Sequence, residues 1–343
     1  MKRLKKKFLI GALFLLTSGF LVCIEGCAGE VSAQTASGVA MGTYVNQTIY
    51  TRDEALTGEV EELLIHLEED VLSWRIEGSE IARINEAAGA ECSISNELKQ
   101  DLIPLLEVSE RSNGAFDCTL GTLIRLWNMD TWSKAEEGGF IPPTKEEIAE
   151  ALTDTGYDKI KIADDMIYLP SDVQLDLGAA GKGIACDRVA AFLADKQVSG
   201  AVISVGGSVV TYGAKPDGTP WRVAVVDPLN PSSRLGILSL TGEWYISTSG
   251  DYERFVEADG IRYHHILDPA TGYPADSGLA GVTIVCHSGL LSDALSTACF
   301  VLGVEDGLAL AESYGAQALF VTADGQLYMT SGMEELFSST LKP

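Results

Sequence analysis

The chain has 343 residues, of which 46% are hydrophobic and 21% charged, so it is long enough for one large or two ordinary globular domains. Its 49 acidic residues outnumber 24 basic ones, which gives a formal net charge of -25. Such an acidic body repels phosphate backbones, and nucleic-acid binding is therefore disfavoured. An anionic ligand would need a cation or backbone dipoles to hold it.

The N-terminus predicts an export signal. Five basic residues in the first seven positions precede an apolar run, Phe8–Val22, whose length suits a signal peptide and is short for a spanning helix. The residues that follow, ending at Cys27, resemble the cleavage site of a bacterial lipoprotein, with an uncleaved anchor as the alternative. We expect lipidation at Cys27 and a location at the cell membrane, outside the cytoplasm. The predicted organisation is a signal peptide over residues 1–27, a tether over 28–38 and one folded domain over 39–337.

The folded domain is expected to begin with one strand and a series of helices. Apolar residues recur at helical spacing over Asp53–Leu72, and Asn113–Gly114 reads as a helix end. A capping box at Thr144–Glu147 opens a further helix. The elements predicted here are a strand over 42–50, helices over 53–72, 96–112 and up to Trp127, a loop over 129–143 and a helix from about 145.

The second half is expected to supply most of the strands. Alternating residues over 159–176 predict short strands joined by a hairpin turn. The elements predicted after them are a helix over 184–193, strands over 201–205, 209–213, 221–226 and 235–240 in one continuing sheet, strands over 261–263 and 281–285, helices over 292–302 and 304–312, and a hairpin over 318–329.

Five cysteines follow the leader at wide spacing, without a C-x-x-C motif, so neither a disulfide framework nor a zinc site is indicated. We expect most of them to be small buried apolar residues. They are Cys92, Cys118, Cys186, Cys286 and Cys299.

A glycine-rich turn, Gly178–Gly183, lies between a predicted strand and helix. Backbone N–H groups and the helix dipole there can receive phosphate oxygens, with Lys182 as a point charge. It is not a P-loop, because Gly183 stands where Ser or Thr would follow the lysine. A purely structural connection is the alternative.

Two further groups carry chemistry. Asp293 and Thr297 are four residues apart and share a helix face, and a carboxylate with a hydroxyl suits Mg²⁺. The alternative is that Asp293 is a first-turn acid after a Ser292 cap. His264 and His265, two of only four histidines, lie between a strand and a turn, where chemistry often sits; an ordinary surface hairpin is the alternative.

These motifs, taken together and in order, resemble the ApbE family of flavin transferases, the FAD:protein FMN transferases. The resemblance runs from Met41 to about Met329. The motifs that carry it are Met41-Gly42-Thr43, Ser79-Glu80-Ile81 with Asn85, Gly114-Ala115-Phe116-Asp117, Asp176-Leu177-Gly178 with Lys182-Gly183 and Asp187, Gly206-Gly207, Thr248–Tyr252, His264–Pro269 with Thr271-Gly272, and Asp293-Ala294 with Thr297.

The resemblance implies an α+β fold with a T-fold-like core and an added helical part. It implies an exported, Mg²⁺-dependent enzyme that transfers FMN from FAD to a Thr or Ser of an acceptor protein and releases AMP. The acceptor would belong to a membrane electron-transfer complex. A FAD pyrophosphatase yielding FMN and AMP, or a flavin-binding lipoprotein without turnover, are the alternatives.

The resemblance also implies roles for residues. Mg²⁺ would be held by Asp293, Thr297 and the main-chain carbonyl of Ala179. Lys182 and His265 would be catalytic, with His265 either stabilising phosphate or handling the proton of the attacking hydroxyl. His264, its neighbour on the strand, should point to the opposite face and be structural. The implied FAD contacts are Met41, Ala115, Phe116, Asp117, Asp176, Lys182, His265 and Ile266.

The sequence departs from the family pattern at three positions. Arg75, beside Trp74, stands where the family often has an aromatic residue. Ser208 stands where an acid often follows the paired glycines, and Ile184 where tyrosine is usual. The contact that Arg75 and Trp74 make is left open.

Overall fold

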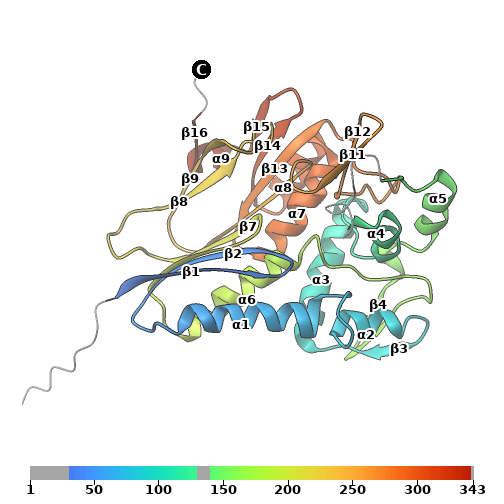
Figure 1. The fold of residues 1–343 in the computed structure, drawn as a ribbon, viewed down its shortest axis with the longest axis horizontal. Helices are drawn as coiled ribbons and strands as arrows, with labels where there is room; N and C mark the ends of the chain where they lie inside the picture. Colours follow the sequence, from blue (N-terminus) through green and yellow to red (C-terminus); the bar gives the residue numbers. More distant parts are fainter. Residues whose placement is uncertain (1–30, 130–139, 341–343) are drawn as a thin grey trace, which may run out of the picture. The chain divides into compact units, whose positions relative to one another are not determined.

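An eight-stranded antiparallel sheet is the largest element of the computed structural model, which describes residues 31–129 and 140–340 (Figure 1). The predicted signal peptide, with Cys27, and most of the predicted loop over 129–143 lie outside the described residues. In sheet order the strands are β1 (Ser32–Ala40), β2 (Thr43–Thr51), β6 (Gly200–Val205), β7 (Ser208–Gly213), β10 (Trp244–Gly250), β13 (Leu279–Cys286), β14 (Gln317–Thr322) and β15 (Leu327–Met329).

Strand β1 corrects the predicted tether. Residues 32–38 pair with β2 in continuous antiparallel register, from Ser32 opposite Thr51 to Ala40 opposite Thr43. Their small, polar side chains carry little strand propensity, so the tether prediction is wrong for these residues: pairing with β2 determines the strand. The described fold also continues past residue 337, because β16 (Phe337–Ser339) follows α9 (Ser331–Leu336).

Two strands expected to continue the main sheet form a separate one. β8 (Trp221–Val226) pairs with β9 (Arg234–Leu240), which also pairs with β16, around buried Trp221, Leu238 and Phe337. The other small sheets are β3 (Glu91–Ser93), β5 (Met166–Tyr168) and β4 (Lys161–Ala163), and the hairpin β11 (Phe255–Ala258) with β12 (Ile261–His264).

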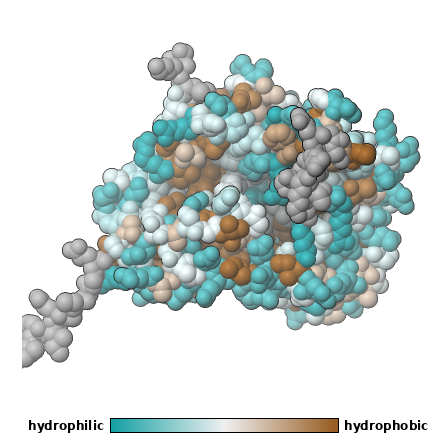
Figure 2. Space-filling model, viewed as in Figure 1, coloured by the Kyte–Doolittle hydropathy of each residue, from teal (hydrophilic) through white to brown (hydrophobic). Residues whose placement is uncertain are grey.

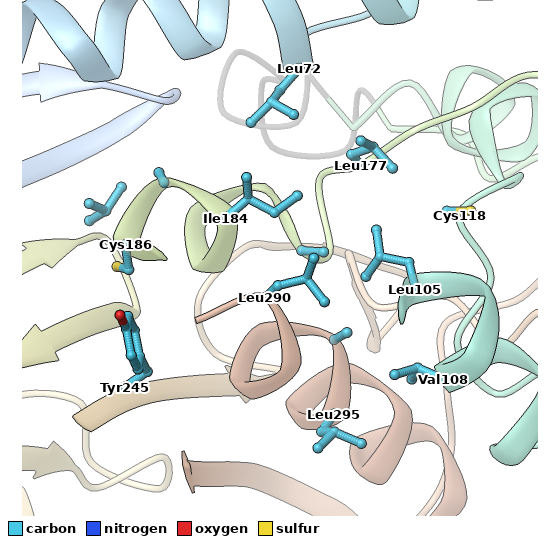
Figure 3. Close-up of a cluster of buried hydrophobic side chains, with 14 of the residues drawn as sticks. Leu72, Leu105, Val108, Cys118, Leu177, Ile184, Cys186, Tyr245, Leu290 and Leu295 are labelled. Atoms are coloured by element: carbon cyan, nitrogen blue, oxygen red, sulfur yellow. The ribbon is translucent and has the colours of Figure 1, made fainter. Parts of the chain in front are cut away.

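Helices α6 and α7 pack against the main sheet and against each other (Figure 3). Ile184 and Cys186 of α6 share one buried cluster with Leu290 and Leu295 of α7 and Tyr245 of β10. The helices are α1 (Leu56–His66), continuing as the π-helix η1 (Leu67–Leu72), α2 (Glu80–Glu86), α3 (Asn96–Arg111), α4 (Gly121–Trp127), α5 (Lys145–Thr153), the 3₁₀ turn η3 (Tyr157–Lys159), α6 (Gly181–Asp195), α7 (Gly289–Leu302) and α8 (Val304–Ser313).

The five cysteines after the leader are free and buried, as expected. Hydrophilic residues cover most of the face shown in Figure 2. Within residues 31–129 and 140–340, every helix is too short or too polar to cross a membrane. The α+β class predicted from the resemblance is confirmed.

Candidate active site

A cavity of about 810 Å³ brings the predicted site residues together. They come from distant parts of the chain, between the β1–β2 turn and the middle of α7. All of them line this one cavity: Met41, Ala115, Phe116, Asp117, Asp176, Ala179, Lys182, His265, Ile266, Asp293 and Thr297. Their proximity is therefore a feature of the fold, whereas their contacts with FAD or a metal stay predictions.

Helix α7 begins one turn earlier than predicted. Ser288 caps it by accepting the N–H of Leu291, and the Asp187 carboxylate accepts the N–H groups of Gly289 and Leu290 at 2.7 Å each. Asp293 thus lies in the second turn, so its interpretation as a first-turn acid behind a Ser292 cap is wrong. Only 2% of Asp293 is exposed, a degree of burial that requires partners for its charge.

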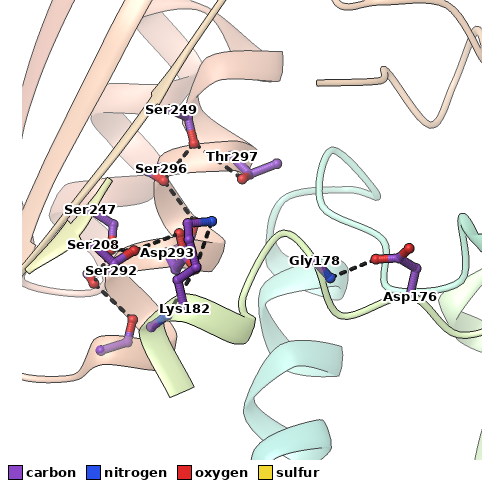
Figure 4. Close-up of polar contacts among 12 residues, drawn as sticks. Asp176, Gly178, Lys182, Ser208, Ser247, Ser249, Ser292, Asp293, Ser296 and Thr297 are labelled. Atoms are coloured by element: carbon purple, nitrogen blue, oxygen red, sulfur yellow. Dashed lines mark hydrogen bonds and ion pairs between the residues drawn. The ribbon is translucent and has the colours of Figure 1, made fainter. Parts of the chain in front are cut away.

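Three groups of the protein partner the carboxylate of Asp293 (Figure 4). One oxygen accepts the N–H of Gly183 at 3.0 Å and lies 3.6 Å from Lys182 Nζ. The other accepts the hydroxyl of Ser208 at 3.3 Å. Gly183 has to be glycine, because an added Cβ would lie 2.1 Å from the main-chain oxygen of Gly289.

Three of the residues lining the cavity offer oxygen donors that fit a hard cation. Asp293 offers a carboxylate, Thr297 a hydroxyl and Ala179 a main-chain carbonyl, and Mg²⁺ prefers such oxygen ligands. Within the part of the chain that the structure describes, no group of three His, Cys, Asp or Glu side chains forms a metal centre. Mg²⁺ would therefore depend on the hydroxyl and carbonyl as well as the carboxylate.

The glycine turn is held by Asp176, which is 6% exposed. Its carboxylate accepts the N–H of Gly178 at 2.6 Å and the indole N–H of Trp74, and lies 3.7 Å from Arg75. The guanidinium of Arg75 also lies 4.2 Å from the centre of the Trp74 ring. Arg75 thus takes a structural ion pair where the family often has an aromatic residue, and Trp74 supplies the aromatic surface beside the turn.

The carboxylate of Asp117 also forms hydrogen bonds within the protein. It accepts the N–H and hydroxyl of Thr119, at 2.7 and 2.6 Å, and the N–H of Tyr157. Burial raises its pKa, and these donors offset part of that cost. These bonds fix the corner that places Phe116 in the cavity wall.

His265 is a neutral hydrogen-bonding group. Its Nδ1 lies 3.2 Å from the main-chain oxygen of Arg254, and since a carbonyl only accepts, Nδ1 carries the proton and Nε2 keeps its lone pair. Burial, then the charges of Arg254 and Lys182, lower the pKa of His265 from 6.5 to about 3. A neutral ring disfavours the cationic phosphate clamp, and a pKa of about 3 also makes Nε2 a weak base, so Nε2 suits accepting a hydrogen bond from a hydroxyl.

His264 faces away from the cavity, as expected. Its Nε2 lies 3.0 Å from the main-chain oxygen of Ala275, and its ring packs edge-on against Phe300. Burial lowers its pKa. Its role is structural.

The cavity also contains residues that sequence reasoning missed. Glu68 of η1 accepts the N–H of Met41, which has a left-handed φ of 56°, and no periodicity reveals a π-helix. The carboxylate of Glu253 lies against the paired glycines: a Cβ on Gly207 would be 3.1 Å from its Oε1. Burial raises the pKa of Glu253. The sequence signal for Glu253 is its position directly after the Thr248–Tyr252 motif.

The pKa of His265 predicts a pH dependence of stability. Because its folded-state pKa lies below the unfolded value of 6.5, the unfolded chain binds more protons between pH 6.5 and about 3, and His265 costs stability as the pH falls. Urea midpoints of the wild type should therefore drop more between pH 7 and 4 than those of His265→Gln. A His287→Gln control, at an exposed position where Nδ1 contacts the main-chain oxygen of Glu243, should follow the wild type; equal slopes for all three proteins would contradict this.

One cavity is surrounded by a glycine turn, a lysine and a carboxylate–hydroxyl pair. The protein therefore belongs to the class of α+β proteins suited to binding a phosphate-bearing nucleotide. The model of the ApbE family matches residues 41–320. The FAD:protein FMN transferase of Treponema pallidum (strain Nichols) is 32% identical, over 92% of this chain and 93% of its own. This chain belongs to the ApbE family.

Solved structures agree with this assignment. The crystal structure of the ApbE protein from Thermotoga maritima matches with a TM-score of 0.81 at 30% identity, over 89% of this chain and 99% of that one. The apo form of the flavinyl transferase ApbE from Pseudomonas stutzeri matches with a TM-score of 0.76 at 33% identity, over 92% and 99%.

Proposed function

We propose that this protein is a FAD:protein FMN transferase. The hydroxyl oxygen of a Thr or Ser of an acceptor protein attacks the phosphorus of the FMN half of FAD. The bond to the AMP phosphate breaks, AMP leaves, and the hydroxyl gives up its proton. The observation that carries the proposal is the convergence of the motif residues on one cavity in a chain of this family.

The residues present suit this chemistry. Splitting a pyrophosphate depends on positioning and charge neutralisation, and a Mg²⁺ ion held by Asp293, Thr297 and Ala179 would offset charge on the phosphates. Lys182 adds a positive charge beside Asp293. His265 would orient the attacking hydroxyl through a hydrogen bond to Nε2, and the negative charge of bound phosphates would raise its pKa toward a value at which it can take the proton. In a chain of charge -25, these cations oppose the repulsion of an anionic substrate.

The test is to incubate the full chain with FAD, Mg²⁺ and a candidate acceptor protein and to follow the flavin. The proposal expects protein-bound FMN and AMP in equal amounts, and neither when Mg²⁺ is chelated. Free FMN with AMP would identify a pyrophosphatase, and unchanged bound FAD a flavin-binding protein without turnover. Either of these outcomes contradicts the proposal.

We also propose that the mature chain is lipid-anchored at Cys27 outside the cytoplasm and serves a membrane electron-transfer complex. The basic, apolar and Cys27-terminated leader supports this. A lipid-modified N-terminal peptide starting at Cys27, identified by mass spectrometry of the membrane fraction, is the expected result. An unmodified N-terminus would contradict it.

A further inference from the structure

Behind the two side chains proposed to hold the cation lies a set of five buried serines (Figure 4). Each is at most 7% exposed, and hydroxyl contacts link them in two groups, Ser208–Ser247–Ser292 and Ser249–Ser296. We call this set the serine ladder: Ser208 of β7, Ser247 and Ser249 of β10, and Ser292 and Ser296 of α7.

The ladder follows from matching a strand to a helix. Residues two apart on a strand lie about 6.6 Å apart, and residues four apart on a helix rise about 6 Å. Ser247 therefore meets Ser292 at 2.8 Å, while Ser249 meets Ser296 at 2.8 Å. These two rungs set the register of α7 on β10, and with it the position of the cation-facing side chains.

The upper part of the ladder ends on the Asp293 carboxylate. Ser247 donates to Ser208 at 3.0 Å, and Ser208 donates to Asp293 at 3.3 Å. Because the Gly183 N–H donates to the other oxygen, both carboxylate oxygens accept a hydrogen bond from the protein. Hydroxyl donors in series strengthen one another and fix the orientation of the final acceptor.

The lower part of the ladder ends on Thr297. A hydroxyl that binds a cation uses a lone pair, so its proton must point elsewhere. Ser249 lies 3.3 Å from Thr297 Oγ1 and can accept that proton. Ser249 can then donate to Ser296, which donates to the main-chain oxygen of Asp293 at 2.8 Å. The hydroxyl protons of Thr297, Ser249 and Ser296 thus each have an acceptor, and the three hydrogen bonds run in the same direction.

We propose that the serine ladder positions the cation site: Ser208 aims the carboxylate of Asp293, and Ser249 takes the proton of Thr297 so that its lone pairs face the cation. This inference rests on the cation site of the proposed function and deepens it. It explains how Ser208 supports the site where the family often has an acid. Ser208 and Ser249 are positioning residues, since they act through the two cation-facing side chains.

The test is calorimetric titration of Mg²⁺ into the full chain with FAD bound. Groups that orient metal ligands contribute about 10–100-fold in affinity. Ser208→Ala and Ser249→Ala should therefore each raise the dissociation constant for Mg²⁺ by that factor. Ser249→Thr keeps the hydroxyl and should restore most of the affinity. Urea unfolding of each variant separates lost stability from lost affinity.

Ser109→Ala is the matched control. Ser109 is equally buried and donates to a main-chain oxygen of its own helix, α3, outside the cavity wall. It should lose stability without losing Mg²⁺ affinity. If Ser208→Ala and Ser249→Ala bind Mg²⁺ as the wild type does, or if Ser109→Ala weakens binding as much as they do, the ladder proposal is wrong. A wild type that transfers FMN but binds no Mg²⁺ would overturn the ladder and leave the transferase; one that binds Mg²⁺ but transfers nothing would overturn the transferase alone.

Discussion

Asp293→Ala is expected to slow FAD turnover about 1,000-fold, because loss of about 4 kcal/mol of charge stabilisation slows a reaction by that factor. Asp293 is the one carboxylate in the predicted cation set, and it also holds Lys182 at 3.6 Å. The rate of AMP release at saturating Mg²⁺ measures the effect.

Asp293→Asn separates the charge from the fold. The amide oxygen can still accept the N–H of Gly183, so stability should suffer less than in Asp293→Ala, while turnover should fall by a similar factor. Asp217→Asn, at an exposed turn, should leave turnover unchanged. An Asp293→Asn variant with wild-type turnover would refute the role of this carboxylate in cation binding.

Gly183→Ala is expected to have the largest effect on stability, about 3 kcal/mol, as for overpacking of a rigid contact. The new Cβ would lie 2.1 Å from the main-chain oxygen of Gly289 and 2.7 Å from Asp293 Cβ, so α6 and α7 would have to move apart. The free energy of unfolding in urea measures the loss.

Gly58→Ala provides the control for this prediction. Gly58 lies within α1, and an added Cβ would meet nothing within 4 Å. Alanine there should raise stability by about 0.5–1 kcal/mol, since glycine is the poorer helix former. If Gly183→Ala instead behaves like Gly58→Ala, the close approach of α6 and α7 is not as described.

Local signals predicted much of the helical structure. The Thr144 capping box begins α5 as expected, apolar spacing predicts the long N-terminal helix, and Asn113–Gly114 indicates the end of α3. The start of α7 was missed by three residues because one of its caps, Asp187, comes from α6. Partners brought by the fold likewise explain β1, whose strand depends on pairing with β2.

The candidate site was predicted mainly through the family resemblance, since each motif alone has a plain structural alternative. The resemblance identifies Asp293 and Thr297, but neither spacing nor motif shows that Ser247 and Ser249 lie behind them. That contact depends on the packing of α7 on β10. The neutral state of His265 likewise depends on its burial near the charges of Arg254 and Lys182. Lys182 is distant in the sequence and Arg254 belongs to none of the motifs, so the sequence did not indicate this state.

The most direct test of the central claim is the intact mass of an acceptor protein after incubation with this protein, FAD and Mg²⁺. We predict a gain equal to FMN less one water, at a single Thr or Ser, with AMP released in equal amount and neither product formed by Asp293→Asn. An acceptor of unchanged mass, accompanied by free FMN and AMP, would contradict the assignment as a protein flavin transferase.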